Sequence, residues 1–366
     1  MDTEKLYQAL SEVVKRAGGA IPVFDTPELF DLLKDLVNED EAALAIEMPR
    51  ELITAQALAE KTGRALEEVT EKLESMTDNG FLHAMKNPDG SYRYNIMALL
   101  PGIFEAQFLK GTKTDRDYLI AKRFKGYLDL LNELRKSLDK PPSAPKVSYF
   151  RVLPVEEEVK GGSTVLPFTE LSKYVDQTSA IAVGTCFCRH FAVLNDENDR
   201  CGASHNNCMA FGDGAVFIAE RHNGRLVDKR EAMEILKQAE EEGLVHCSAN
   251  TSNELVFICN CCTCHCGILS QAKSIPQASL MLTSGYFAQV EGDLCTACET
   301  CLERCPVTAI NIDDVALVDK QQCIGCGLCV SSCPEEAIAL QVSPDNTMPP
   351  ATMGLLEKEI KAARAK

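Results

Sequence analysis

A cysteine pattern that occurs twice near the C-terminus constrains this chain more than any other feature. Residues 295–305 and 323–333 both read Cys-x2-Cys-x2-Cys-x3-Cys, and a proline follows each copy. The second copy begins 28 residues after the first and repeats its Ala-Ile at the same offset. Eight thiols in a duplicated order predict that this part of the chain binds metal.

The other cysteines and the charge narrow the class of protein. The 366 residues contain 18 cysteines, with none in the first 185 and ten between Cys186 and Cys266. The acidic start lacks the pattern of a secretory signal, and no apolar run reaches the roughly 18 residues of a membrane span. We therefore expect a cytoplasmic protein whose cysteines bind metal rather than form disulfides. The net charge of −17 disfavours nucleic acid and anionic membranes as partners and is compatible with a basic protein face.

The duplicated motif resembles that of bacterial-type ferredoxins, which hold two [4Fe-4S] clusters. A tight loop can direct three thiolates at three iron corners, but the fourth corner faces away and needs a remote ligand. The resemblance implies that this ligand comes from the other repeat, and that short helices begin at residues 307–310 and 335–338. A pair of zinc sites would not need eight cysteines in this order. The implied ligand sets are Cys295, Cys298, Cys301 and Cys333 for one cluster, and Cys323, Cys326, Cys329 and Cys305 for the other.

The cysteine-rich middle of the chain is expected to combine helices and strands. An apolar segment, 179–186, predicts a buried strand that carries Cys186 and Cys188 on one face at its end. Residues 228–243 predict a capped amphipathic helix, and residues 254–260 predict a second strand. That strand runs into the sequence CNCCTCHC. Regular alternation would place Cys259 and Cys261 on one face and Cys262, Cys264 and Cys266 on the other, so a turn must intervene or two sites are present.

Three interpretations of the middle cysteines stay open from the sequence. They bind a third iron–sulfur cluster, they bind structural zinc with or without a cluster, or they form a thiol redox centre such as the vicinal pair Cys261–Cys262. Cys247 stands alone and is expected to be a core residue. The candidate metal ligands are Cys186, Cys188, Cys201, Cys208, Cys259, Cys261, Cys262, Cys264 and Cys266.

The polar neighbours of these cysteines are weaker candidates. His190, His205 and His246 are individually expected to be ordinary polar residues, whereas His265 is flanked by cysteines and is the histidine to test as a ligand. Arg189 and His190 follow a Cys-x-Cys sequence directly. They are candidates for tuning the charge of a cluster or for contacting an anionic substrate.

The N-terminal part predicts helix, turn, helix and hairpin over residues 50–100. This order resembles a winged-helix domain, a fold common in DNA-binding regulators. The second helix is expected to bury Leu66, Val69, Leu73 and Met76. Residues 1–110 contain 11 Lys and Arg against 20 Asp and Glu, which gives −9 and disfavours DNA binding. The exposed face of that helix carries Glu67, Glu68, Glu71 and Glu74, with Lys72 as its single base.

Most of the chain resembles a largely uncharacterised family of cytoplasmic iron–sulfur proteins from anaerobic bacteria and archaea. The resemblance rests on "PGIFE", on a CxCRH segment, on a CNCC run and on the two ferredoxin motifs. Relatives often carry cysteine where this chain has His265. The family implies electron transfer with a partner oxidoreductase, and no dinucleotide or Walker fingerprint is present. The alternatives are a reductase with a substrate-binding cluster and a redox-responsive regulator.

The expected fold is α+β and multidomain, with a winged-helix-like part (1–140), a cysteine-rich part (147–285), a ferredoxin module (286–342) and a tail with a short helix (343–366).

Overall fold

The computed structural model describes residues 2–137, 147–155, 171–196, 202–275 and 277–364. The Pro-rich linker predicted at 138–146 lies outside these residues. Among the described helices, none has both the length and the apolar character needed to cross a membrane. The four-part division expected from the sequence stays a prediction. The chain forms two compact units: Met1–Pro142 with His190–Asn198 and Val216–Arg225, and Ser143–Arg189 with Asp199–Ala215 and Leu226–Lys366.

Capped helices form most of the first unit. The side chains of Asn38 and Glu41 each accept a hydrogen bond from the other's backbone amide, and Thr114 and Asp117 do the same. These capping boxes satisfy amides that a helix start leaves unpaired. Leu10 and other leucines of the inner faces are fully buried. The helices outside the hairpin region are α1 (Thr3–Ala17), α2 (Pro27–Leu36), α3 (Glu39–Ile46), α6 (Phe104–Phe108), which follows the irregular turn Leu99–Ile103, and α7 (Asp115–Lys136).

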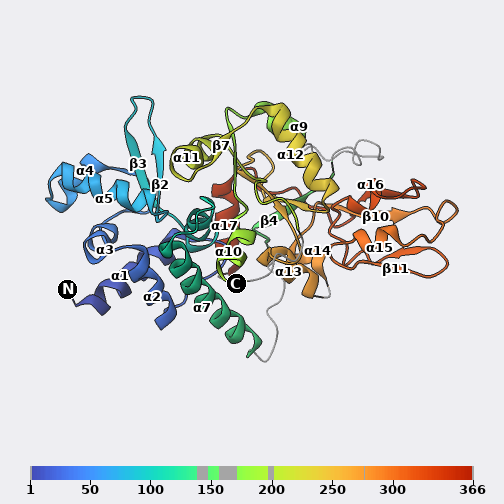
Figure 1. The fold of residues 1–366 in the computed structure, drawn as a ribbon, viewed down its shortest axis with the longest axis horizontal. Coiled ribbons are helices and arrows are strands. Elements are labelled where there is room, and N and C mark those ends of the chain that lie inside the picture. The colour runs from blue at the N-terminus through green and yellow to red at the C-terminus, as the bar shows by residue number, and fades with distance from the viewer. Residues whose placement is uncertain (1, 138–146, 156–170, 197–201, 276, 365–366) are drawn as a thin grey trace. The chain divides into compact units, whose positions relative to one another are not determined.

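A helix pair and a hairpin follow α3 in the order that the sequence predicts. The strands pair antiparallel in the order β1-β3-β2, and the hairpin extends from the helices of this unit (Figure 1). Assignment to the winged-helix class stays a proposal. Leu66 is 45% exposed, so its predicted burial is wrong, because it begins the helix ahead of the turns that pack. The elements are β1 (Ile53–Thr54), α4 (Ala55–Thr62), α5 (Leu66–Asp78), β2 (Leu82–Lys86) and β3 (Tyr92–Ile96).

A six-stranded sheet in the order β4-β8-β9-β6-β5-β7 runs through the cysteine-rich region. The strand predicted at 254–260 is β9, and its antiparallel partner β8 places Cys247 opposite Cys259. The pairings of β4 with β8, of β9 with β6 and of β6 with β5 are also antiparallel. The strands are β4 (Phe150–Leu153), β5 (Ile181–Gly184), β6 (Cys208–Phe211), β7 (Arg225–Leu226), β8 (Val245–Ala249) and β9 (Phe257–Cys261).

The helices of this region include the one predicted at 228–243. It is α12, which Asp228 caps by accepting a hydrogen bond from the Glu231 amide, and which buries Leu236 and Ala239. It lies beside α9 (Figure 1). Within the described residues of this region, the helices are α9 (Leu171–Gln177), α10 (Phe187–Leu194), α11 (Asp213–Arg221), α12 (Lys229–Glu241), α13 (Gly267–Ser274) and α14 (Ala278–Met281).

The prediction that a strand carries Cys186 and Cys188 on one face is wrong. The pairing of β5 with β6 stops at Gly184, which lies opposite Cys208. The Cys186 amide then donates to the carbonyl oxygen of His205 (2.6 Å), and α10 begins at the next residue. Cys188 therefore lies in the first turn of a helix, where its direction is set by the helix and not by strand alternation.

Two antiparallel strand pairs frame the C-terminal module, β10 with β13 and β11 with β12. The short helices predicted at 307–310 and 335–338 are wrong, because both segments lead into strands. Helical turns instead contain Cys301 and Cys329. The elements are β10 (Tyr286–Val290), α15 (Thr300–Arg304), β11 (Ile310–Ile312), β12 (Ala316–Val318), α16 (Leu328–Ser331), β13 (Ile338–Val342) and, in the predicted tail, α17 (Met353–Arg364).

One apolar core continues from the sheet into the C-terminal module. It contains Cys247 of β8, Leu269 of α13, Phe287 of β10 and Cys323 of the second repeat. All of these side chains belong to the second compact unit. The thiols of the cysteine-rich region and those of the C-terminal module therefore belong to one folded body.

Candidate metal centres

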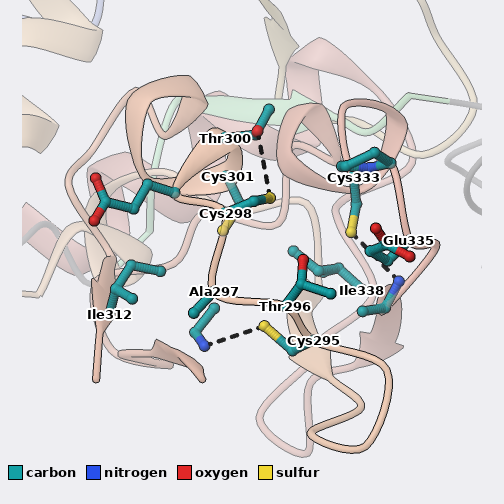
Figure 2. A pocket seen from close by; sticks show the side chains of 14 residues that line it. Cys295, Thr296, Ala297, Cys298, Thr300, Cys301, Ile312, Cys333, Glu335 and Ile338 are labelled. Carbon is teal, nitrogen blue, oxygen red and sulfur yellow. Dashed lines mark hydrogen bonds between the residues drawn. The ribbon is translucent and has the colours of Figure 1, made fainter. Parts of the chain in front are cut away.

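The first cavity of the C-terminal module is surrounded by thiols from both repeats. Its lining includes Cys295, Cys298, Cys301 and Cys333. Figure 2 shows Cys333 across the cavity from the three cysteines of the first loop. The structure thus brings together the set that the ferredoxin resemblance implies for one cluster.

The second cavity contains the complementary set. Its lining includes Cys323, Cys326, Cys329 and Cys305. Apolar side chains such as Val307 and Leu340 complete the wall. Four thiols around an apolar hollow match the needs of a [4Fe-4S] cluster, which takes four thiolates and holds its potential partly by exclusion of solvent.

Backbone amides that follow the remote cysteines point back at their sulfurs. The Ala309 amide donates to the Sγ of Cys305 (3.2 Å), and the Ala337 amide donates to the Sγ of Cys333 (3.3 Å). Each amide lies four residues after its cysteine. Such hydrogen bonds favour the thiolate over the thiol and are one of the protein's means of setting a cluster potential.

A second pair of amides crosses between the repeats. The Ala288 amide, seven residues before Cys295, donates to the Sγ of Cys323 (3.5 Å). The Ala316 amide, seven residues before Cys323, donates to the Sγ of Cys295 (3.4 Å). The strand that precedes each repeat therefore supports the first cysteine of the other repeat, as interleaved ligation requires.

The two loops also share their backbone conformation. Ala297 and Gly325 occupy equivalent positions with φ of +53° and +67°, and Glu299 and Gly327 follow with +66° and +86°. Left-handed backbone is easy for glycine and costly for other residues. The first loop thus keeps the conformation that turns thiols inward although it lacks both glycines.

Gly325→Ala is expected to remove the cluster of the second cavity, which lowers the iron content by about 4 atoms per chain. A Cβ at this position would collide with the carbonyl oxygen of Tyr286 and the hydroxyl of Ser284. Gly292→Ala is the matched control, because its Cβ would meet no atom within 4 Å. Iron analysis of both variants makes the comparison, and equal iron in the two would contradict it.

The two cavities differ in their access to solvent. Cys298 of the first set is exposed, whereas Cys323, Cys326 and Cys329 of the second are buried. Burial raises the pKa of Cys326 to about 12, and hydrogen bonds from Thr300 lower the pKa of Cys298. The first cavity is therefore the one that an external electron donor or acceptor can approach.

The comparisons with known proteins support this chemistry for the second repeat. A family described as the 4Fe-4S binding domain matches residues 316–339, which contain Cys323, Cys326, Cys329 and Cys333. The search of curated proteins gives no match to this chain. The ferredoxin-type prediction is confirmed for this segment, and the number of clusters belongs to the proposal below.

Six thiols of the cysteine-rich region form a separate group, here called the six-thiol group. It draws on the segment before α10, on α10 itself, on the start of β6, on β9 and on the residue before α13. Its members contact one another through their side chains in the order Cys186, Cys208, Cys259, Cys261, Cys266 and Cys188.

The thiols of this group cannot all be ionised at once without a positive charge beside them. Hydrogen bonds with Cys186 and Cys259 lower the pKa of Cys208 well below its ordinary value. The contact with Cys208, together with burial, raises the pKa of Cys186. The contact with Cys247 is the main cause that raises the pKa of Cys261 to about 12. Neighbouring thiolates repel one another, so a metal centre is the ordinary means of holding several together.

A buried arginine supplies positive charge beside the group. Arg189 is 1% exposed, and its guanidinium donates to the carbonyl oxygens of Ser204 (2.6 Å) and Asn260 (3.3 Å) and to Oδ1 of Asn207 (2.7 Å). Burial lowers the pKa of Arg189, but the surrounding thiols, above all Cys186, outweigh burial and raise that pKa above its ordinary value. A buried cation needs a compensating anion, and thiolates are the anions that its surroundings offer.

Two helix starts add to this field. Cys186 precedes α10 directly, and Cys266 is the N-cap residue of α13. A helix N-terminus carries partial positive charge and unpaired amides, which stabilise nearby anions. Arg189 and the two helix starts together fit the six-thiol group to a negatively charged metal–thiolate centre.

Among the other candidates, Cys247, His246 and His190 each contact other residues of the chain. Cys201 lies outside the described residues. Cys247 is buried and contacts Cys261, so it lies in the core, as predicted, at the edge of the six-thiol group. His246 is bonded through Nδ1 to Asn260 Oδ1 (2.6 Å) and through Nε2 to Glu240 (3.0 Å). His190 is bonded through Nε2 to the carbonyl oxygen of Thr112 (2.7 Å).

Cys262, Cys264 and His265 form a third group in the turn between β9 and α13. Their ligand atoms all lie within 4.8 Å of one another. A turn intervenes in this run, which is one of the two arrangements that the sequence left open. The Cys266 amide donates to the carbonyl oxygen of Cys262 (3.2 Å), and this turn reverses the chain so that Cys266 contacts Cys261 and Cys188 instead.

Proposed function

We propose that the protein transfers single electrons through three iron–sulfur centres. Two [4Fe-4S] clusters would occupy the cavities of the C-terminal module, with the interleaved ligand sets given above. A third cluster would be held by four members of the six-thiol group. The clusters supply the one-electron chemistry, and the chain supplies thiolates, amide donors and a buried cation.

One observation carries this proposal most directly. The core that contains Cys261 and Cys266 of the six-thiol group also contains Cys323, Cys326 and Cys329 around the second cavity and Cys301 at the first. Electron transfer weakens steeply with distance, so centres that share one core form an efficient path. The exposure of Cys298 supports an outer end of that path at the first cavity.

A reductive titration followed by electron paramagnetic resonance tests the proposal. Anaerobically purified protein is expected to take up about three electrons per chain, one for each cluster. Magnetic coupling between reduced centres should broaden the signals, because the centres share one core. Uptake of two electrons would reduce the protein to a two-cluster ferredoxin with an inert middle region.

The observed contacts favour neither alternative function. A substrate-binding reductase would use Arg189 or His190 to hold a substrate, but both side chains are buried and bonded to other parts of the chain.

Ion pairs around α5 also disfavour the alternative of a DNA-binding regulator. Arg221 forms ion pairs with Glu74 (2.7 Å) and Asp78 (2.9 Å) of α5, the helix that would enter DNA. Lys72 pairs with Asp40 (2.6 Å). These ion pairs support a structural or docking role for the N-terminal part.

The surface beside the first cavity indicates the kind of partner. Glu299 and Glu335 line the cavity and are exposed. Arg304, the single base in the segments 291–304 and 333–336, donates to backbone carbonyls of Glu240 and Glu241. We propose a partner with a basic face. Further exposed acids in the neighbouring sequence are Asp293, Glu303, Asp313, Asp314 and Glu336.

Neutralising this acidic surface is expected to slow electron transfer to a basic acceptor. Glu299→Gln with Glu335→Gln should lower the rate of reduction of cytochrome c several-fold at low salt, with the difference vanishing near 1 M salt, where screening acts over about 3 Å. Glu67→Gln with Glu71→Gln on α5 changes the net charge equally and serves as control. Stopped-flow rates over a salt series provide the readout, and equal slopes for both double variants would contradict the assignment.

A further inference from the structure

The turn at residues 262–265 has ligand geometry that the six-thiol group does not use. Cys262 Sγ lies 3.6 Å from Nδ1 of His265. A tetrahedral zinc ion, with Zn–S about 2.3 Å and Zn–N about 2.0–2.1 Å, separates a sulfur and a nitrogen ligand by about 3.6 Å. The spacing of these two atoms is therefore that of ligands to one ion.

The chain separates this group from the six-thiol group. Cys262 follows the end of β9 and packs with Ala239 and Leu244, whereas Cys261 and Cys266 belong to the apolar core that continues into the C-terminal module. The side-chain contacts of Cys262 run to His265, Cys264 and Arg189. Those of Cys261 run to Cys247, Cys259 and Cys266. Arg189 lies near both groups, so one cation serves two sets of thiols.

The chemistry of the three ligands selects the ion. Two sulfurs and an imidazole suit Zn²⁺ and other thiophilic ions, whereas Ca²⁺ and Mg²⁺ require oxygen ligands. Cys264 and His265 are half-buried, so solvent reaches the site.

We propose that Cys262, Cys264 and His265 bind one mononuclear zinc ion, distinct from the iron–sulfur centres. Among the residues that the structure describes, this site has three protein ligands, which leaves one position of a tetrahedral ion without a protein ligand. A water molecule or an external thiol would complete the tetrahedron, as in zinc sites that keep an open position. This site goes beyond the electron-transfer proposal and does not depend on it.

Metal analysis of the full chain, purified anaerobically after growth with added zinc, tests the site. We expect one zinc per chain, with a zinc absorption spectrum that shows two sulfur ligands near 2.3 Å and one nitrogen. His265→Ala and Cys264→Ser should each weaken zinc retention against a chelator by about tenfold or more while iron stays at its wild-type level. Cys186→Ser, which lies outside the turn, is the matched control and should leave zinc at its wild-type level.

Two results would overturn the proposal. One is a failure of zinc binding at this turn: either the wild-type protein holds no zinc, or His265→Ala retains zinc as firmly as the wild type. The other is loss of iron together with zinc in His265→Ala or Cys264→Ser, which would make these residues part of an iron–sulfur site. Iron retained by the C-terminal module shows in each case that the variant has folded. Failure of the three-electron titration leaves this test intact.

Discussion

Arg189→Met is expected to lower the iron content from about 12 to about 8 atoms per chain, because the third cluster is lost and the two clusters of the C-terminal module stay. The guanidinium is the buried positive charge beside Cys186 and Cys208. Its removal leaves a negatively charged centre without compensation and strips the carbonyl oxygens of Ser204 and Asn260 of their donor. Breaking one side of a buried charge pair typically costs roughly 3–5 kcal/mol.

Arg189→Lys separates charge from geometry. Lysine keeps the positive charge but lacks the planar fork that serves three acceptors at once, so we expect partial iron loss. In protein that keeps its third cluster, a shifted potential of that cluster would identify Arg189 as a positioning residue with an electrostatic effect. Full retention of about 12 iron atoms in Arg189→Met, at an unchanged potential, would contradict the assignment.

The second large effect distinguishes interleaved from local ligation. Cys333 belongs to the second repeat but lines the first cavity, and Cys305 belongs to the first repeat but lines the second. Cys333→Ser should therefore remove the solvent-accessible cluster, and Cys305→Ser should remove the buried one. Each variant is expected to lose about 4 iron atoms.

Cluster decay on exposure to air, or on removal of iron by a chelator, reads out which cluster survives. In Cys333→Ser the surviving cluster of the C-terminal module is the one beside buried Cys326 and should decay slowly, whereas in Cys305→Ser it lies beside exposed Cys298 and should decay quickly. The reverse order of decay would show that each repeat supplies all four ligands to its own cluster.

The elements with strong local signals could be predicted from the sequence. The helix capped by Asp228 and the strand that ends at Cys261 follow from periodicity and capping. Residues 307–310 and 335–338 were expected to be helical but lead into strands. There the amides of Ala309 and Ala337 donate to the sulfurs of the cysteines four residues earlier, in place of the carbonyl oxygens that a helix would use.

The grouping of the middle cysteines could not be predicted, because it depends on where regular structure stops. Cys188 leaves the expected strand since α10 begins at Phe187, and Cys266 leaves the group of Cys262 and Cys264 because a turn intervenes. Arg189 was recognisable as a candidate from its place after Cys-x-Cys. Its role as a buried cation depends on Asn207 and Asn260, whose positions come from separate strands and loops.

Iron and acid-labile sulfide per chain, measured on anaerobically purified protein, test the central claim of three iron–sulfur centres most directly. The account predicts about 12 iron and about 12 sulfide, four of each for every cubane. About 8 of each, on protein that still contains all its cysteines in reduced form, would contradict a third cluster in the six-thiol group.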